Sequence, residues 1–376
     1  MAVIGGGVIG LACALELRGL GAGEVTVLER LPGVGLGSSS RANGGVRAQF
    51  ATAPNVAFSI FSIDAFEQLE ARSGLLGFRQ TGYLLVTGTD EGERRVRAAR
   101  DLQRSLGVPT RWVEPDEIAW IAPFVRADGL HGGTFHDRDG VLDPAGLVTV
   151  LERDARAAGA RIRTETSVRA IVQDGGGFAL ASDDGSLHAE VVVNAAGPDA
   201  RAIAGMLGAD VPVEPVRRNL ALFLDPRVEP TPMVVDVDTG VLVRGDVAGG
   251  WVVGYSRPDD PPGRDTSVDP AFFDDLAERL PNRFGFLADL ALDSARCWAG
   301  LYPETPDHHA VVGPDPAVPG LVHCIGFGGH GIMHAPAAGR AVAEVVAHGR
   351  CDTFDLRPLR PERFDEGDLV VETAVL

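Results

Sequence analysis

The first thirty residues switch from a short apolar run to a glycine-rich turn and then to a helical pattern. Residues 2–4 are apolar, residues 5–10 contain four glycines, residues 11–20 have helix-forming character, and residues 25–28 are again β-like and end at Glu29. A strand, a glycine turn, a helix and a second strand in this order predict a βαβ unit.

The rest of the chain shows two different patterns of apolar, glycine and proline residues. Between about 213 and 293 short β-like runs alternate with proline-rich turns, which favours an antiparallel sheet. From 321 an apolar strand, a glycine cluster and a helix return to the first pattern, and the polar tail after Arg350 is expected to wrap over the surface. The predicted helices are 55–72, 91–106, 144–158, 269–280 and 335–347, and the further strands are 83–86, 161–164, 191–194, 220–224, 241–244, 251–254 and 321–325.

Composition narrows the class of protein. A chain of 376 residues with 45% hydrophobic and 23% charged residues is a globular protein of about two domains rather than a fibre or a disordered chain. The net charge of −18 repels nucleic acid and anionic membrane surfaces, so we expect no nucleic-acid partner. No stretch is long and apolar enough for a membrane span.

Residue usage removes several mechanisms. All 34 basic residues other than histidine are arginine, so the chain offers no lysine for a Schiff base or a P-loop. Cys13, Cys297, Cys324 and Cys351 are far apart and form no metal-binding pattern, so we expect no metal. Isolated cysteines of this kind are typical of a reducing compartment, and we predict a cytoplasmic protein.

The glycine turn carries a dinucleotide motif. Gly5, Gly7 and Gly10 form GxGxxG after a strand and at the start of a helix. The first glycine makes the turn, the second lets the backbone approach a pyrophosphate, and the third allows close packing of helix on strand. Glu29, at the end of the second strand, is placed to accept ribose hydroxyls.

NAD and FAD both use this motif, and two distant segments favour FAD. The predicted strand 191–194 ends in Asn194-Ala195-Ala196-Gly197, which would abut the dinucleotide. Gly326-Phe327-Gly328-Gly329-His330-Gly331 starts a second helix, and this suits a second anionic position such as the flavin O2/N1 edge.

These segments resemble the D-amino-acid-oxidase (DAO) superfamily of FAD enzymes. The chain is most similar to sarcosine oxidase beta subunits and dimethylglycine-dehydrogenase-like proteins, because Gly44-Gly45-Val46-Arg47 and the Gly329 to Ala337 segment fit them. The matching stretches span nearly the whole chain: 3–10 with 29–30, 38–50, 139–144, 194–197, 298–301, 305–307 and 326–340.

The resemblance implies an α/β fold with a discontinuous Rossmann-like FAD domain and an interleaved antiparallel substrate domain. The implied boundaries are 1–78, 144–212 and 297–349 for the FAD domain, 79–143 and 213–296 for the substrate domain, and 350–376 for a C-terminal tail. The motif and the resemblance together predict a cofactor site formed by Gly5, Gly7, Val8, Ile9, Gly10, Glu29, Arg30, Ser38, Ser39, Asn43, Gly44, Gly45, Val168, Ala195, Ala196, Gly197, Gly326, Gly328, Gly329, His330, Gly331, Ile332 and Met333.

Enzymes of this family take a hydride equivalent from a carbon next to nitrogen, and the imine then hydrolyses. Such chemistry needs a group that holds the substrate carboxylate, and Arg47 at the end of the Gly-Gly-Val-Arg loop is the first candidate, with a structural salt bridge as its alternative. His330 resembles the family histidine near the flavin, unless it only bonds backbone in a tight turn. Tyr255 and Tyr302 are the tyrosines expected in the pocket, or are ordinarily packed side chains. Arg244 and Arg257 are weaker carboxylate candidates.

The sequence also departs from the family. Val252 and Met333 stand where monomeric sarcosine oxidases carry lysines, Tyr302 stands near their FAD-tethering cysteine, and Ala145 near the FMN-tethering histidine of heteromeric ones. We therefore expect one noncovalent FAD. The missing positive charge favours a protein or quinone acceptor over O2, and partner subunits of a heteromeric complex fit this pattern.

Three functions follow. The first is oxidation of the C–N bond of a small secondary or N-methyl amino acid. The second is oxidation of a 2-hydroxy acid on the same fold. The third is a flavoprotein with an assembly or partner-binding role, in which bound FAD is reduced by no small substrate.

Overall fold

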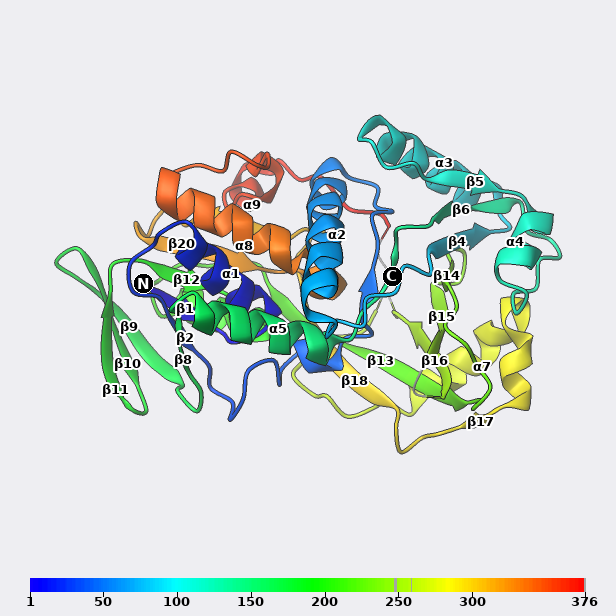
Figure 1. The fold of residues 1–376 in the computed structure, drawn as a ribbon, viewed down its shortest axis with the longest axis horizontal. Coiled ribbons are helices and arrows are strands. Elements are labelled where there is room, and N and C mark those ends of the chain that lie inside the picture. The colour runs from blue at the N-terminus through cyan, green and yellow to red at the C-terminus, as the bar shows by residue number, and fades with distance from the viewer. Residues whose placement is uncertain (247–248, 258, 375–376) are drawn as a thin grey trace.

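Two large β-sheets, each the centre of one lobe, organise the molecule (Figure 1). The computed structural model describes residues 1–246, 249–257 and 259–374. The six-stranded sheet of the first lobe runs in the order β19-β20-β12-β1-β2-β8, and all neighbours are parallel except β19 with β20. Its strands are β1 (Ala2–Ile4), β2 (Thr26–Leu28), β8 (Arg161–Arg163), β12 (Val192–Asn194), β19 (Val311–Pro314) and β20 (Leu321–Ile325).

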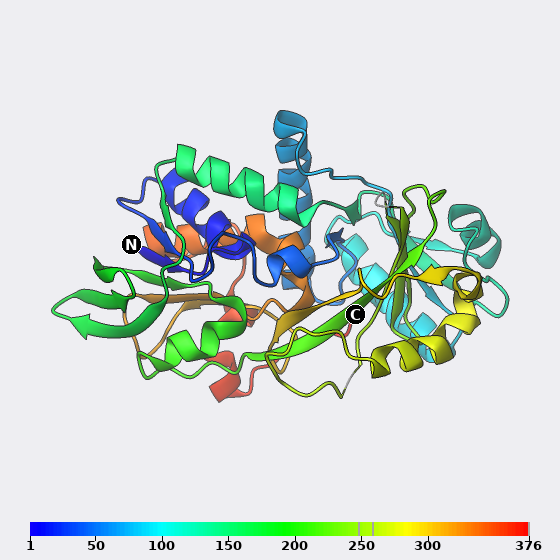
Figure 2. The same cartoon turned by 90° about the horizontal axis from the view of Figure 1, so that it is seen from below.

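Side chains of β1 alternate between two layers that cover this sheet. Val3 packs among the helices of one face, whereas Ala2 and Ile4 pack against a three-stranded antiparallel sheet and a short helix on the other. Figure 2 shows the helices above the sheet and the hairpins below it. The helices of the first face are α1 (Val8–Gly19), α2 (Ala53–Ser73), α5 (Pro144–Ala157) and α8 (Gly331–His348), and the opposite layer is β9 (Val168–Asp174), β10 (Gly177–Ser182), β11 (Gly185–Ala189) and α6 (Ala200–Gly205).

The second lobe is a nine-stranded sheet in the order β17-β13-β16-β15-β14-β4-β6-β5, with β18 also paired to β13. All its pairs are antiparallel except β14 with β4. Its strands are β4 (Tyr83–Thr87), β5 (Arg111–Val113), β6 (Gly132–His136), β13 (Glu214–Leu224), β14 (Met233–Asp236), β15 (Val241–Asp246), β16 (Gly250–Tyr255), β17 (Ala291–Leu292) and β18 (Trp298–Glu304). Its helices are α3 (Asp90–Ser105), α4 (Pro115–Ile121) and α7 (Ala271–Arg283), and β3 (Gly45–Val46) pairs with β7 (Gly140–Val141) at the junction of the lobes.

The predicted α/β fold is confirmed, with a Rossmann-like sheet and an antiparallel second sheet. Each predicted helix and strand has a counterpart, although α8 starts at Gly331 instead of 335 because the glycine turn is itself helical. The chain crosses between the lobes near the predicted domain boundaries. The division itself stays a prediction, and β18 pairs with the second sheet although the boundary at 297 assigns it to the first lobe.

The C-terminal tail runs mostly over the surface, as expected, but two of its charged side chains are buried. After α9 (Arg363–Glu366) it passes beside α2 to the junction of the lobes (Figure 1). Arg363 and Glu372 are both buried. Among the described residues, no helix combines the length and the apolar character that crossing a bilayer requires.

Candidate active site

A cavity of about 550 Å³ opens where the carboxyl ends of the parallel strands meet the second sheet. Ligands of open parallel sheets bind at this edge. Glycine-rich or acidic turns after β1, β2, β12 and β20 form the inner part, and Tyr83 of β4, Leu242 of β15 and Tyr302 of β18 close the outer part. The predicted site residues that line it are Gly5, Gly7, Val8, Ile9, Glu29, Arg30, Ser38, Ser39, Asn43, Gly44, Gly45, Arg47, Ala195, Ala196, Gly197, Tyr302, Gly326, Gly328, Gly329, His330, Gly331, Ile332 and Met333.

The first glycine turn is shaped by close backbone approach. Gly5 has φ +109°, and a Cβ there would lie 2.3 Å from the carbonyl oxygen of Ala195. No side chain caps α1 at Gly7, so the start of this helix keeps N–H groups for an anion. The N–H of Val8 donates to Oγ of Ser39 at 3.2 Å, which brings the loop of residues 38–45 over the helix start.

Glu29 is fixed by backbone donors at the end of β2. Its carboxylate accepts from the N–H groups of Gly6 at 2.7 Å and Leu31 at 2.8 Å. The carboxylate lies on the cavity wall, and its predicted contact with a ribose stays a prediction.

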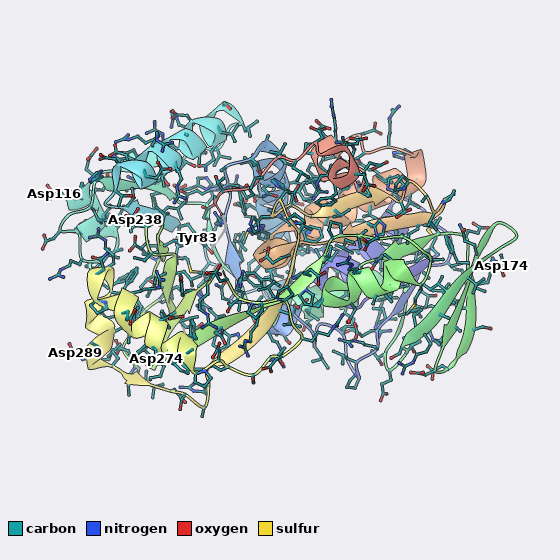
Figure 3. The ribbon with its side chains drawn as sticks, turned by 180° about the vertical axis from the view of Figure 1, so that it is seen from behind. Tyr83, Asp116, Asp174, Asp238, Asp274 and Asp289 are labelled. Carbon is teal, nitrogen blue, oxygen red and sulfur yellow. The ribbon has the colours of Figure 1, made fainter. Side chains whose placement is uncertain are left out.

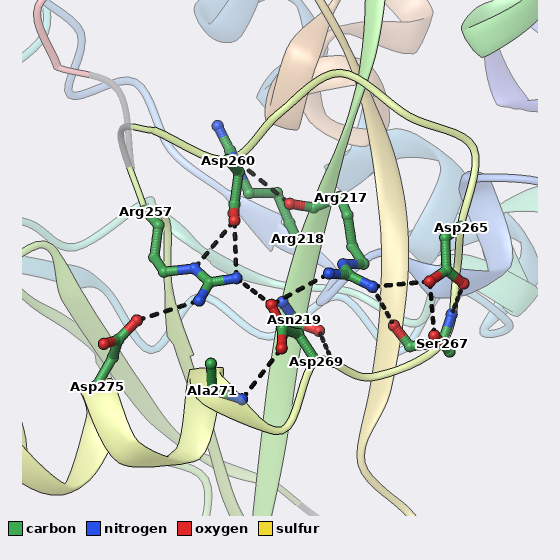
Figure 4. A network of polar contacts seen from close by, with 10 residues as sticks. All are labelled: Arg217, Arg218, Asn219, Arg257, Asp260, Asp265, Ser267, Asp269, Ala271 and Asp275. Atoms are coloured by element: carbon green, nitrogen blue, oxygen red, sulfur yellow. Dashed lines mark hydrogen bonds and ion pairs between the residues drawn. The ribbon is translucent and has the colours of Figure 1, made fainter.

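A loop from the second lobe, residues 259–270, covers the rim of the cavity. Figure 4 shows the charged network that holds it: Asp269 accepts from both Arg257 and Arg217, and Asp260 accepts from Arg257 at 2.9 Å and from Arg218 at 3.2 Å. Arg257, a weaker carboxylate candidate from the sequence, is therefore committed to this network. Networks of this kind hold a segment in one geometry, because each ion has several partners.

The same loop reaches the cofactor end of the cavity. Arg264 and Thr266 line it, and Arg264 bonds the carboxylate of Asp199 and the carbonyl of Pro198. Asp199 also pairs with Arg30 at 2.9 Å. Residues of the two lobes thus meet in one ion-pair cluster at the mouth.

Arg47 lies at the substrate end and is only 2% exposed. Its guanidinium donates to the carbonyls of Gln49 and Ala374 and stacks 4.1 Å from the ring centre of Phe50. Burial lowers the pKa of Arg47. Within the described part of the chain it makes no ion pair, so the structural salt bridge that the sequence left open is not found. A buried guanidinium with spare N–H donors is a strong site for a carboxylate.

Two tyrosines form the outer wall near Arg47: Tyr83 is buried and Tyr302 is half-buried. The ring of Tyr302 lies against the backbone of Gly329, where a Cβ would stand 2.5 Å from it. Tyr83, which sequence reasoning missed, presses its hydroxyl against the Gly45 turn and faces the first lobe (Figure 3). Burial raises the pKa of both phenols, so they stay protonated and act as hydrogen-bond donors.

His330 is neutral in the folded protein. Burial first, and the nearby charge of Arg47 second, hold its pKa well below the usual range. Its ring meets Phe50 edge-on at 4.8 Å. His334, one turn further along α8, contacts Oγ of Ser59 at 3.0 Å, and the same two causes lower its pKa to about 3.

Three predicted site residues lie off the cavity wall. Gly10 faces the strand, and a Cβ there would lie 1.9 Å from the carbonyl oxygen of Gly5, so its role is packing. Val168 starts β9 in the layer below the sheet and does not line the cavity. Tyr255 points to the α7 face of its sheet instead of the cavity, and the guanidinium of Arg279 stacks 4.0 Å from its ring centre there.

Two further predicted positions can be placed. Arg244 supports the site from behind, since its Nη2 donates to the carbonyl of Asn43 at 2.9 Å. Met333 lines the cavity, whereas Val252 is buried in β16 and does not line it, although it lies on the same face of the sheet as Arg244. Of the two positions at which the resemblance implies lysines, Met333 is the one that lines the cavity.

The fold and the site define a dinucleotide-binding oxidoreductase with a substrate lobe. A family model described as DAO, FAD dependent oxidoreductase, matches residues 1–345, and the chain belongs to this family. The predicted FAD cofactor is confirmed at the level of the family, and the open start of α1 together with the Gly326–Gly331 turn suits its pyrophosphate and flavin.

Relatives and solved structures agree with this family. FAD-dependent oxidoreductase domain-containing protein 1 of Bos taurus is 29% identical, with 100% of this chain and 86% of the relative covered. 4-methylaminobutanoate oxidase (formaldehyde-forming) of Paenarthrobacter nicotinovorans is 28% identical over 96% of this chain, which spans 45% of that relative. The crystal structure of L-proline dehydrogenase from P. horikoshii has a TM-score of 0.92 at 28% identity and covers 98% of both chains.

Proposed function

We propose that the protein oxidises the C–N bond of a small secondary or N-methyl amino acid. The glycine turns after β1 and β20 would hold FAD, which would supply the acceptor for the hydride that leaves the substrate carbon; water would then hydrolyse the resulting imine to a carbonyl compound and an amine. The observation that carries the proposal is the buried guanidinium of Arg47, which has no ion-pair partner among the described residues and lies beside the glycine turns of the cofactor site.

Named relatives support the substrate class. Their names include dimethylglycine dehydrogenase of Rattus norvegicus, sarcosine dehydrogenase of Mus musculus and the 4-methylaminobutanoate oxidase, and the solved L-proline dehydrogenase is similar along its full length. Each of these names denotes an amino acid whose nitrogen carries more than one carbon substituent. The chain spans less than half of the first three relatives, so their whole activities are no more than a guide.

The residues of this chain bind and orient the substrate. Arg47 holds the carboxylate through a pair of charge-assisted hydrogen bonds. Tyr302 and His330 bound the space next to the reacting carbon, and the protonated phenols of Tyr83 and Tyr302 supply further donors. Because His330 is neutral, it places no second positive charge beside the substrate nitrogen. Positioning and exclusion of water are then the main contributions of the protein.

When bound, FAD supplies the hydride acceptor. We propose a noncovalent FAD, and a protein or quinone rather than O2 as its oxidant, because Met333 and Val252 replace the lysines of the related oxidases. A heteromeric complex with partner subunits is the corresponding proposal for the assembly, and a reducing cytoplasmic location fits the four free cysteines.

The test is anaerobic mixing of the purified yellow protein with sarcosine, dimethylglycine, L-proline, glycine, D-alanine and 2-hydroxyglutarate. We expect loss of flavin absorbance near ~450 nm with a secondary or N-methyl amino acid only. Fast recovery in air would identify an oxidase, and slow recovery would support a dehydrogenase. Bleaching by 2-hydroxyglutarate alone would replace the proposal with 2-hydroxy-acid oxidation, and bound FAD that nothing bleaches would favour the partner-binding role.

A further inference from the structure

The C-terminal tail carries a carboxylate that is almost completely buried. Glu372 is 1% exposed, and its two oxygens accept four hydrogen bonds. The donors are the N–H groups of Ala51 at 2.9 Å and Ala374 at 2.8 Å, the hydroxyl of Thr52 at 2.7 Å, and the side-chain amide of Asn55 at 3.0 Å. Three of these four donors belong to the segment that starts α2, which is more than 300 residues away along the chain.

The neighbouring backbone completes the anchor. The N–H of Glu372 donates to the carbonyl of Asp307 at 3.0 Å. Two residues further on, the carbonyl of Ala374 accepts from Nη2 of Arg47, the same guanidinium that lines the cavity. Glu372 is thus fixed to α2 on one side and, through the turn at Ala374, reaches Arg47 on the other.

We propose that Glu372 is a positioning residue for the substrate site. It holds the tail segment 372–374 against Arg47, so that the Ala374 carbonyl orients the guanidinium that lines the cavity. The part of this inference that concerns a carboxylate substrate rests on the proposed function. The docking of the tail on Arg47 does not depend on it.

The physical basis is the cost of leaving the donors unpaired. A buried carboxylate with four donors is stable only in that pocket, so the tail has one favoured position. If the carboxylate is removed, Asn55 loses this acceptor, Thr52 keeps only its contact with Nε2 of His309 at 2.8 Å, and segment 372–374 has no charged anchor of its own. Nη2 of Arg47 then loses its carbonyl partner, and the guanidinium is free to turn away from the geometry that a substrate carboxylate needs.

The experiment compares three variants of the FAD-loaded protein. Glu372→Ala removes the anchor, Glu372→Gln keeps its shape and part of its hydrogen bonding, and Val371→Ser changes an exposed neighbour in the same tail. The probes are methoxyacetate and tetrahydro-2-furoate, acids that have the carboxylate but no amine. Their dissociation constants are measured from the change in the flavin absorption spectrum.

We expect Glu372→Ala to raise the dissociation constants of both acids about 10-fold. Glu372→Gln should give intermediate values, and Val371→Ser should bind the acids like the wild type. Two measurements need no substrate: hydrogen exchange of the amides in residues 367–374, and modification of Arg47 by phenylglyoxal. Both should accelerate in Glu372→Ala, while the FAD content and the melting temperature of the variant show that it is folded.

Each outcome decides a separate claim. Equal dissociation constants in Glu372→Ala and Val371→Ser would overturn the positioning role. Equal exchange and modification rates would overturn the docking itself. If the wild-type protein bound neither acid, the proposed function and the substrate part of this inference would fail together. The modification rates would still decide whether Glu372 holds the tail on Arg47.

Discussion

The hydroxyl of Tyr83 occupies the space where a side chain on Gly45 would begin: a Cβ on Gly45 would lie 2.0 Å from Tyr83 Oη. Gly45 belongs to the loop of residues 43–45. The N–H of Gly45 closes the turn of this loop by donating to Asn43 Oδ1 at 2.8 Å. Strand β4 of the second lobe therefore presses directly on the loop that we expect to hold the flavin. The two lobes pack closely at this contact, so a larger side chain at Gly45 or a change of Tyr83 would shift the loop of the cofactor site.

Gly45→Ala should weaken FAD binding, because the methyl group cannot fit unless Tyr83 or the loop moves. Overpacking of this kind costs about 1–3 kcal/mol, which corresponds to roughly 5- to 150-fold in affinity. Titration of the apoprotein with FAD measures the effect. Gly205→Ala is the control, since a Cβ there meets nothing within 4 Å. Unchanged FAD affinity in Gly45→Ala would show that the loop is not tightly packed around the cofactor.

The buried pair of Arg363 and Asp307 should be a main support of the tail. Both side chains are 0% exposed, and the guanidinium donates to the two carboxylate oxygens at 2.7 and 2.9 Å. Arg363→Ala leaves the charge of Asp307 buried without its partner, and we expect a loss of about 3–5 kcal/mol in the free energy of unfolding.

Urea denaturation followed by circular dichroism measures this loss. Arg357→Ala is the matched control in the same segment, because Arg357 is exposed and pairs with Asp368 only at 3.6 Å. We expect less than about 1 kcal/mol for it. Similar losses in the two variants would contradict a structural role for the buried pair.

Stability should fall as the pH drops from about 6.5 to 5, because the unfolded chain protonates His330 and His334 near the ordinary histidine pKa of about 6.5 and the folded protein keeps both neutral. Burial, and next the charge of Arg47, lower the pKa of His334 to about 3 and that of His330 well below its usual range. Each of these two histidines should lower the free energy of unfolding by about 1.4 kcal/mol for every pH unit in this window.

Carboxylates whose pKa is lowered in the folded protein act at lower pH than these histidines. Burial would raise the pKa of Glu344, but hydrogen bonds from Thr353 lower it to about 2, and its contribution is lost only below about pH 4.5. Burial also lowers the pKa of His309, whereas the hydrogen bond with Glu304 raises that of His308 and acts in the opposite direction. Unfolding of His334→Asn, measured between pH 7.5 and 5, should therefore show a slope smaller than the wild-type slope by about 1.4 kcal/mol per pH unit. An unchanged slope would show that another group titrates.

Local signals explain why much of the site could be predicted from the sequence. A GxGxxG turn needs its strand, helix and acidic residue within thirty positions, so Gly5 to Glu29 could be read directly, and the Gly326 turn has the same local character. Tyr83 could not be found in this way. It opens a strand that is buried on both faces, where apolar residues do not alternate with polar ones and so do not show which face a side chain takes. The same uncertainty applies to Tyr255, which lies on the α7 face of its sheet.

The buried charges of the tail could not be predicted for a different reason. Arg363 stands in a polar, charged segment, which is the usual pattern of a solvated surface, and Glu372 is a single charge in the mainly apolar run 369–376. Their burial depends on partners at Asp307 and Thr52, and no local pattern connects positions so far apart in the chain. Buried charges of this kind become visible only when the fold brings the partners together.

Arg47→Met tests the carboxylate site most directly. Methionine keeps a long apolar stem on Phe50 but removes the guanidinium, so two charge-assisted hydrogen bonds to the substrate are lost. We expect a loss of about 3 kcal/mol, or roughly 100-fold, in the binding of an amino-acid substrate or of methoxyacetate. Arg279→Met is the control, since it removes an arginine from the opposite face of the second sheet. The measurement is the dissociation constant from the flavin spectrum, with the FAD content checked first, because Arg47 lies close to the cofactor loop. If both variants bound the acid like the wild type, the carboxylate would be held elsewhere in the cavity.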